Sequence, residues 1–477
     1  MKKYNSKMVE AKWQRIWAKQ KLYQAKDKSK KPKYYCLVEF PYPSGEGLHV
    51  GHIRSYTAMD VIARKRRSEG FEVLYPMGWD AFGLPTENYA IKTGLAPQLI
   101  TKRNTTRYRK QLQSLGFSFD WWREINTTDP EYYKWTQWLF LQFFKKGLAY
   151  KAKMPINWCP KDKIGLANEE VIDGKCERCG TEVEQREKEQ WMLAITKYAD
   201  RLERELDLVD YPESIKTQQR NWIGRAEGAR IKFKVESEKL KEIEVFTTRP
   251  ETIFGVTFIA RHGKADRFTG EYAINPANTE KIPIWEAEYV MGEVGTGAVM
   301  GVPAHDERDL AFAQKHNLPV REAPMADQAT LDKIGAKPHT TYKLRDWVFS
   351  RQRYWGEPIP LIFCNKCNEW QAVPEKDLPV ELPKIKKYQP TDNGESPLAL
   401  IDKWVKMKCP KCKGPARRET DVMPNWAGSS WYYLRFIDPK NSEALVDKEK
   451  EKYWSPVDMY VGGAEPATRH LIYARFY

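Results

Sequence analysis

The sequence has 477 residues and a mass of 55.8 kDa, which suggests about three domains of ordinary size. A hydrophobic fraction of 41% can build packed cores, and a mean hydropathy of −0.69 without a long apolar run argues against a membrane span. The basic N-terminus lacks the apolar core of a secretory signal. The formal charge of +15 leaves two interpretations open, a polyanionic partner such as nucleic acid or simply a Lys-rich surface.

The N-terminal segment has the pattern of an α/β domain. A compact apolar run at 34–40 predicts a buried strand, and the Pro- and Gly-rich stretch 41–47 predicts a turn. A helix is predicted from about His49 to Glu69, followed by Gly70 as its stop and by a second strand at 71–76. Strand, loop, helix and strand in this order predict a parallel, doubly wound sheet.

The pattern changes after about residue 150. From 150 to 190 the sequence looks loop-like, and from about 225 to 345 it is strand-rich, which predicts a separate, mostly β module. A Trp- and Arg-rich segment after 346 leads into a cysteine block at 364–412. The final stretch, 457–477, reads as a strand, a glycine turn and the start of a helix, so we expect the chain to stop inside a structural element.

Two histidines stand at the predicted start of the first helix after the turn. His49 and His52 are three residues apart, so they share one helix face and can donate to one phosphoryl group. Backbone N–H groups at a helix start bind anions, and Gly51 leaves room for a phosphate or a flat ring. Taken alone, the motif is more typical of a pair of ordinary surface or core histidines, with a nucleotide site as the alternative.

The residues around this motif resemble a known family. Residues 40–64, FPYPSGEGLHVGHIRSYTAMDVIAR, resemble the signature region of class I aminoacyl-tRNA synthetases, and MGWDAFGLPTEN at 77–88 resembles its companion strand end. Within that class, PYPSG and GWDAFGLP look like leucyl-tRNA synthetases, whereas valyl and isoleucyl enzymes typically show GWDCHGLP. Further matches follow in order: NWCP (157–160), TTRPETIFG (247–255), GTGAVMGVPAHDERD (295–309), SRQRYWGEPIP (350–360), RETDVMPNWAGSSWYYLR (418–435) and VDMYVGGAE (457–465).

The resemblance implies an α/β fold, namely an incomplete class I synthetase Rossmann-type catalytic domain with an inserted, mostly-β editing domain and a zinc ribbon. The segments expected are 1–150 for the first half of the catalytic domain, 151–224 for a connective segment with a Cys knuckle, 225–345 for the editing domain, 346–420 for a return segment with the zinc ribbon, and 421–477 for the truncated start of the second catalytic half.

The implied activity is that of a leucine–tRNA ligase in the cytoplasm, with ATP, Mg²⁺, leucine and tRNA(Leu) as its ligands and no membrane association. The sequence contains no KMSKS-like loop, so we expect a fragment or one subunit, with a separate C-terminal chain as a candidate partner, and little pyrophosphate exchange by this chain alone. Two alternatives stay open, a synthetase for another branched aliphatic amino acid and a tRNA-editing or tRNA-binding fragment with no activation activity.

The resemblance also implies roles for residues of the catalytic half. The implied catalytic residues His49 and His52 bind the ATP phosphates and the developing negative charge. The residues implied to bind ATP are His49, Gly51, His52, Gly462, Gly463 and Glu465, the last accepting from the ribose hydroxyls. The residues implied to bind leucine are Phe40, Tyr42, Asp80 and His470, with Asp80 holding the α-ammonium. The family often places a histidine where this chain has Pro466.

The strand-rich module resembles the editing domain of the same family. An activation pocket discriminates one methylene by only about 1–3 kcal/mol, so a second, hydrolytic site is needed. The resemblance implies that Thr247 and Thr248 offer hydroxyls near the ester and that Thr252 blocks correctly attached leucine. Asp309 is implied to hold the substrate ammonium, with Asp306 nearby.

Seven of the eight cysteines fall in two candidate metal sites, and Cys36 stands apart in the predicted strand 34–40. Two C-x-x-C knuckles offer four thiolates for tetrahedral Zn²⁺. Their residues are Cys364, Cys367, Cys409 and Cys412. The second candidate combines a Cys-x-x-Asp pair with one knuckle, so a zinc site with three thiolates and a carboxylate and a metal-free knuckle both remain open. Its residues are Cys159, Asp162, Cys176 and Cys179.

Overall fold

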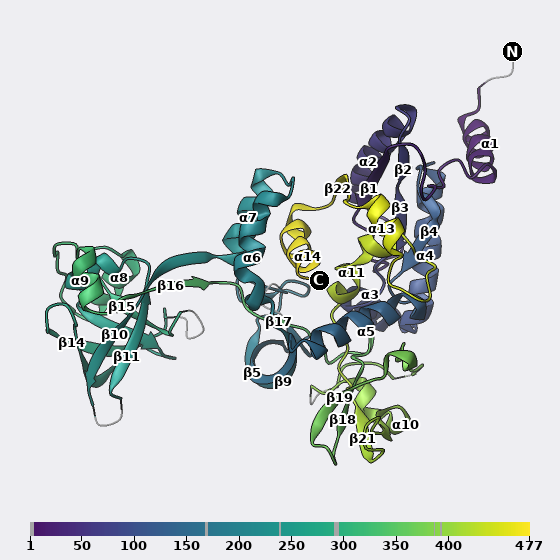
Figure 1. Ribbon diagram of the computed structural model, residues 1–477. Helices are drawn as coiled ribbons and strands as arrows, with labels where there is room; N and C mark the ends of the chain where they lie inside the picture. The colour runs from purple at the N-terminus through teal and green to yellow at the C-terminus, as the bar shows by residue number, and fades with distance from the viewer. Residues whose placement is uncertain (1–3, 167–169, 238–239, 291–294, 386, 392–393) are drawn as a thin grey trace. The chain divides into compact units, whose positions relative to one another are not determined.

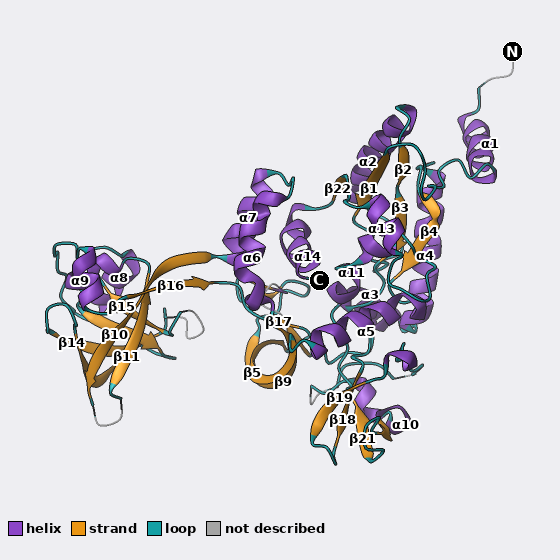
Figure 2. Ribbon diagram, in the orientation of Figure 1, coloured by secondary structure: helices purple, strands orange, loops and turns teal. Residues whose placement is uncertain are grey.

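The computed structural model describes residues 4–166, 170–237, 240–290, 295–385, 387–391 and 394–477, apart from the side chains of Met154 and 464–467. It divides into two compact units, one of residues 1–195 with 346–477 and one of residues 196–345. Figure 1 follows the chain by residue number and Figure 2 separates helices from strands. In the described part of the chain, no helix is long and apolar enough to cross a membrane.

Strand β1 (Lys33–Val38) is the middle strand of a three-stranded parallel sheet. It pairs on one side with β2 (Glu72–Leu74) and on the other with β22 (Met459–Val461), which comes from the far end of the sequence. The last four residues of β1 are all buried, which is why this strand reads as an uninterrupted apolar run. The predicted parallel α/β arrangement is confirmed. A second parallel pair joins β3 (Pro76–Trp79) to β4 (Asp120–Asn126).

Helix α2 (Val50–Ser68) follows β1 and begins directly after His49, as predicted. Tyr56 and Met59 on this helix are buried in the core under the sheet. The other helices of this unit are α1 (Ser6–Lys19), α3 (Leu84–Thr93), α4 (Pro97–Ser114), α5 (Pro130–Lys145), α10 (Asp402–Val405), α11 (Asn425–Ser429), α12 (Tyr432–Arg435), α13 (Lys448–Trp454) and α14 (Ala464–Phe476).

The loop predicted for 150–190 is wrong over much of its length. Strand β5 (Ala149–Cys159) pairs antiparallel with β9 (Glu184–Leu193) along nearly its whole length. The backbone ladder holds these strands together, and the start of β9 is exposed and charged, with Glu187 3.0 Å from Lys153, so the apolar alternation that marks a strand is missing. The sheet is completed by β6 (Ile164–Leu166) and β17 (Trp347–Val348), and a short hairpin joins β7 (Val171–Ile172) to β8 (Lys175–Cys176).

The unit of residues 196–345 contains a seven-stranded sheet, in the order β11-β10-β13-β14-β12-β15 with β16 paired to β10. Alternate residues of β10, among them Ile231 and Phe233, are buried in its core. A Cβ on Gly228 would lie 2.0 Å from the carbonyl oxygen of Thr247, so only glycine lets β10 approach β11 this closely. The strands are β10 (Arg225–Glu236), β11 (Glu242–Thr247), β12 (Phe258–His262), β13 (Arg267–Ile274), β14 (Lys281–Ala287), β15 (Ala298–Gly301) and β16 (Lys337–Tyr342).

Four short helices accompany this sheet. Figure 2 shows α8 and α9 side by side against the strands, and α6 and α7 precede β10 in the chain. Their bounds are α6 (Ala199–Arg204), α7 (Glu213–Ile223), α8 (Glu307–Lys315) and α9 (Gln328–Lys333).

The cysteine block after 360 folds as a small four-stranded antiparallel sheet in the order β19-β18-β21-β20. The strands are short and two tight turns between them carry the cysteines. They are β18 (Leu361–Cys364), β19 (Glu369–Ala372), β20 (Lys406–Lys408) and β21 (Pro415–Arg418).

Candidate active sites and metal centres

The loop after β1 brings two histidines to the start of α2. His49 is exposed and His52 is half-buried, and the centroids of their rings lie 3.8 Å apart. A Cβ on Gly51 would lie 2.9 Å from Nδ1 of His49, so glycine is needed for the ring to lie against the helix start. The structure therefore places the three residues of the predicted phosphate-binding motif together at a helix N-terminus, where anions bind.

His52 is a neutral imidazole with a defined tautomer. The backbone N–H of His49 donates to Nδ1 of His52 over 3.3 Å, which leaves the ring proton on Nε2. Burial, followed by the neighbouring His49, lowers the pKa of His52 to about 4. At neutral pH this side chain therefore offers one N–H donor, from Nε2, and carries no charge.

A glycine turn after β22 lies beside Glu39. The N–H of Gly463 lies 3.4 Å from Oε2 of Glu39, and a Cβ on Gly462 would come equally close to that oxygen. Burial raises the pKa of Glu39, and the Gly463 N–H opposes the shift. Both glycines are exposed, so their backbone is open to a ligand. The side chains of Glu465 and Pro466 lie outside the described residues.

A cavity of about 30 Å³ lies beside this turn, walled by the loops after β1 and β3 and by α11, α12 and α14. All four residues predicted to bind leucine are in its wall: Phe40, Tyr42, Asp80 and His470. Burial lowers the pKa of His470 to about 4, so this side chain is neutral at pH 7. The structure thus gathers the predicted leucine residues around one small, aromatic cavity.

Asp80 is a buried carboxylate with one oxygen unsatisfied. Its side chain is 1% exposed, and among the described residues Oδ1 has no hydrogen-bond partner. Burial raises the pKa of Asp80 well above its usual range, and a hydrogen bond with Ser429 opposes this shift. An ammonium group beside Oδ1 would supply both the missing hydrogen bond and the opposite charge.

The rest of the cavity wall had no role assigned from the sequence. Tyr432 stacks on Phe40, and Trp426 and Ser429 precede it in the segment 418–435, which resembles a family motif. The many aromatic and small residues of this segment were the sequence signal that could have indicated a cavity wall. The unassigned wall residues are Glu39, Trp426, Ser429, Tyr432 and Tyr460.

A second and larger cavity, of about 250 Å³, lies within the unit of residues 196–345. It is bounded by the end of β11, by β15 and by the start of α8. The structure brings all five residues predicted for editing to its wall: Thr247, Thr248, Thr252, Asp306 and Asp309. Four further polar wall residues were not predicted: Arg249, Tyr289, His305 and Arg308.

The backbone of Arg249 organises two of these threonines. Its N–H donates to Oγ1 of Thr247 over 3.0 Å, and its carbonyl accepts from the hydroxyl of Thr252 over 2.8 Å. Thr252 is 3% exposed. The hydroxyl proton of Thr252 is therefore already donated to a backbone carbonyl of the protein.

Both aspartates of the larger cavity also have protein partners. Asp309 accepts from the hydroxyl of Tyr289 over 2.9 Å and from the N–H of Val302 over 2.8 Å. Asp306 caps α8 by accepting from the N–H groups of Arg308 and Asp309. Burial raises the pKa of Asp309, whereas for Asp306 hydrogen bonds outweigh burial and its pKa is lowered.

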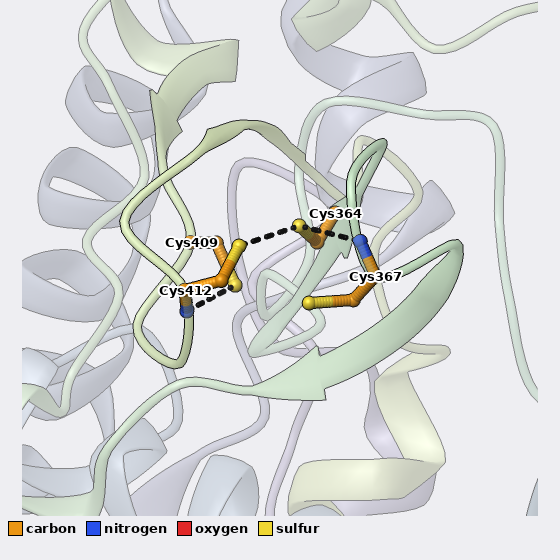
Figure 3. A group of neighbouring side chains, drawn as sticks. All are labelled: Cys364, Cys367, Cys409 and Cys412. Carbon is orange, nitrogen blue, oxygen red and sulfur yellow. Dashed lines mark hydrogen bonds between the residues drawn. The ribbon is translucent and has the colours of Figure 1, made fainter.

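Four cysteines of the small antiparallel sheet converge on one point, as Figure 3 shows. All their ligand atoms lie within 4.8 Å of one another, with Sγ of Cys364 and Sγ of Cys412 3.4 Å apart. The N–H of Cys367 donates to Sγ of Cys364, and that of Cys412 donates to Sγ of Cys409. Four sulfurs at this spacing fit a tetrahedral ion with Zn–S bonds of about 2.3 Å.

The second predicted set also comes together. The ligand atoms of Cys159, Asp162, Cys176 and Cys179 lie within 4.8 Å of one another. Sγ of Cys159 and Sγ of Cys179 are 3.4 Å apart, and the Asp162 N–H donates to Sγ of Cys159 as in a knuckle. Three thiolates and a carboxylate in this arrangement also suit zinc.

Comparisons with known proteins agree with this architecture. A family model described as tRNA synthetases class I (I, L, M and V) matches residues 12–228 and 338–471. A second model, described as Leucyl-tRNA synthetase, editing domain, matches residues 220–264 and 259–345. The fold is therefore that of a class I tRNA synthetase with an inserted editing domain.

Two curated relatives cover 100% of this chain: the leucine–tRNA ligase of Alkaliphilus oremlandii (strain OhILAs), 52% identical, and that of Elusimicrobium minutum (strain Pei191), 48% identical. The chain covers 68% and 65% of them. A crystal structure of the ternary complex of Agrobacterium radiobacter K84 agnB2 LeuRS-tRNA-LeuAMS has a TM-score of 0.89 and 38% identity, over 99% of this chain and 65% of that one. The chain belongs to the leucine–tRNA ligase family, whose members are aminoacyl-tRNA ligases, and it spans about two thirds of these relatives' length.

Proposed function

We propose that the chain binds leucine and ATP for the formation of leucyl-adenylate and carries a second site that hydrolyses wrongly charged tRNA(Leu). The observation that carries the first part is the buried Asp80 with its unsatisfied Oδ1 in an aromatic cavity. The wall of this cavity suits an amino acid chemically, because Asp80 can bind its α-ammonium while Phe40 and Tyr42 contact its apolar side chain. Leucine is the substrate that the names of the curated relatives support.

The histidine pair supports the ATP part of the proposal. Amino-acid activation is an attack of a carboxylate on the α-phosphorus, so it needs alignment and charge stabilisation more than a protein nucleophile. His52 donates from Nε2 to a phosphate oxygen, with His49 beside it at the helix start. Gly462 and Gly463 leave their backbone open to the adenosine. The predicted role of Glu465 at the ribose concerns a side chain outside the described residues. Mg²⁺ bound with ATP supplies further neutralisation of the phosphate charge.

The larger cavity supports the hydrolytic part of the proposal. The hydroxyl of Thr248 and that of Thr247 lie near the ester, Thr252 restricts the space for correctly attached leucine, and Asp309 with Asp306 binds the ammonium. Because activation cannot by itself reject closely similar side chains, a second site that hydrolyses the wrong ester raises accuracy.

Zinc in both cysteine clusters is part of the proposal. The four-thiolate cluster lies in a small, Lys-rich sheet, so a bound ion would replace much of the core that this segment lacks. The second cluster would be stabilised in the same way, with Asp162 as its oxygen ligand. We also place the protein in the cytoplasm, where the cysteines, all free thiols here, stay reduced.

A second candidate function is hydrolysis of mischarged tRNA without activation. It is favoured by one observation, that the larger cavity is formed entirely by residues of a single compact unit. Two assays separate the candidates: calorimetric titration of the chain with a leucyl-sulfamoyl-adenosine analogue, and release of isoleucine from isoleucyl-tRNA(Leu). The main proposal expects both signals, and the Asp80→Ala variant should lose only the first. Hydrolysis without analogue binding would support the second candidate.

A further inference from the structure

Hydrolysis of an ester at neutral pH is accelerated by a group that takes a proton from the attacking water. In the larger cavity the obvious bases are already engaged. Asp306 accepts from N–H groups at the start of α8, and Asp309 accepts from the Tyr289 hydroxyl and the Val302 N–H. These carboxylates are therefore suited to fixing the cavity wall and binding an ammonium, and the proton acceptor has to be another group.

His305 lines the same cavity, directly before the start of α8. Its backbone is fixed, because its N–H donates to the carbonyl of Val302 over 2.9 Å. Among the described residues, the half-buried His305 ring has no hydrogen-bond partner. The rings of the other three histidines of the unit each have a hydrogen-bond partner: His262 pairs with Val290, His316 with Asp266, and His339 with Arg230.

The other titratable and charged groups facing this cavity are less suited to accept the proton. Arginines stay protonated, which removes Arg249 and Arg308. Burial, followed by the charge of Asp309, raises the pKa of Tyr289, so its hydroxyl stays protonated and donates to Asp309. The lowered pKa of Asp306 makes its carboxylate a weak base. An imidazole is the side chain whose ordinary titration range matches a base at neutral pH.

We propose that His305 is the general base of ester hydrolysis in the cavity between β11, β15 and α8. The proposal rests on the editing activity proposed above. Water adds to the ester carbonyl carbon while an imidazole nitrogen of His305 takes one of its protons. The bond from that carbon to the ribose oxygen then breaks, and the imidazolium returns the proton to the leaving ribose oxygen. One water is consumed, and the products are the free amino acid and uncharged tRNA.

The test is a single-turnover measurement of isoleucine release from isoleucyl-tRNA(Leu), with the chain in excess. His305→Gln keeps a polar side chain of similar size and should lower the rate by about 100-fold. The matched control is His316→Gln, at the opposite end of α8, whose ring is paired with Asp266 and does not line the cavity. The control should keep the rate of the unchanged chain. Thermal unfolding of both variants serves as the check that each is folded.

Two further readouts separate a chemical role from a structural one. The rate of the unchanged chain should fall on acidification, because a protonated imidazole accepts no proton, whereas the rate of His305→Gln should not depend on pH in this way. Added free imidazole should restore part of the rate to His305→Ala. A full rate in His305→Gln, or an acid limb that persists in it and so belongs to Asp309, would overturn the role of His305 while leaving editing intact. Absence of hydrolysis by the unchanged chain would overturn both.

Discussion

The ring of Phe40 lies flat against the ring of Tyr432, with centroids 4.2 Å apart and planes within 1°. Phe40 follows β1 near the start of the chain, and Tyr432 opens α12 near its end. The two segments meet because β22 pairs with β1 and α12 packs in the same core. The wall of the proposed leucine site therefore depends on segments that are distant in the sequence.

Loss of this stack should weaken binding in the small cavity. Phe40→Leu removes the ring but keeps an apolar side chain, and an aromatic pair contributes about 0.5–1.5 kcal/mol beyond area burial. We expect the affinity for a leucyl-sulfamoyl-adenosine analogue to fall by about 3–10-fold, measured by calorimetry. Phe143→Leu, which breaks the stack of Phe143 on Phe476, is the matched control and should keep the affinity. Equal losses in both variants would show a general loss of stability instead.

A buried ion pair should contribute more to stability than an exposed one. Arg353 and Glu87 are 3% and 0% exposed at their side chains and 2.5 Å apart. Arg353→Met leaves the Glu87 carboxylate buried without its partner, so the free energy of unfolding should fall by about 3–5 kcal/mol in urea titration. Lys406→Met, in the exposed pair with Asp402, should cost less than about 1 kcal/mol. An equally small loss in the free energy of unfolding for both variants would contradict the argument from burial.

The four-thiolate cluster predicts a zinc content that depends on its cysteines. Cys409→Ser should lower the zinc bound per chain by about one and lower the thermal stability, because one tetrahedral ligand is lost. Elemental analysis after extensive dialysis measures the zinc. Cys36→Ser, at a buried position in β1 outside both clusters, is the control and should keep the zinc content. Cys176→Ser tests the second cluster in the same way, and an unchanged zinc content would argue against metal there.

Asp421 predicts a pH-dependent stability. Burial, followed by the charge of Glu419, raises its pKa to about 7, above the value near 3.8 expected in the unfolded chain. Between these two values the folded state holds a proton that the unfolded state has released, so this group makes stability fall as pH rises. Asp421→Asn removes this loss and keeps an acceptor for Nε2 of Gln352. The variant should gain stability relative to the unchanged chain at pH 8 and little at pH 4. An equal gain in stability at pH 4 and at pH 8 would contradict the raised pKa of Asp421.

The sequence predicts the elements near the histidine motif well, because β1 and α2 have clear apolar patterns and ends. It also predicts both cysteine sets, since knuckle spacing is local in the chain. It fails for β5 and β9, because the exposed, charged residues at the start of β9 show no apolar alternation although the two strands pair along the backbone. It assigned no role to Tyr432 or to His305, because a cavity wall depends on which segments meet in space.

The most direct test of the central claim compares leucyl-, isoleucyl- and valyl-sulfamoyl-adenosine analogues by calorimetric titration of the unchanged chain. Because a hydrophobic pocket discriminates such side chains by about 1–3 kcal/mol, the leucyl analogue should bind at least about 10-fold more tightly than the other two. Equal or tighter binding of the isoleucyl or valyl analogue would contradict a leucine site at Asp80.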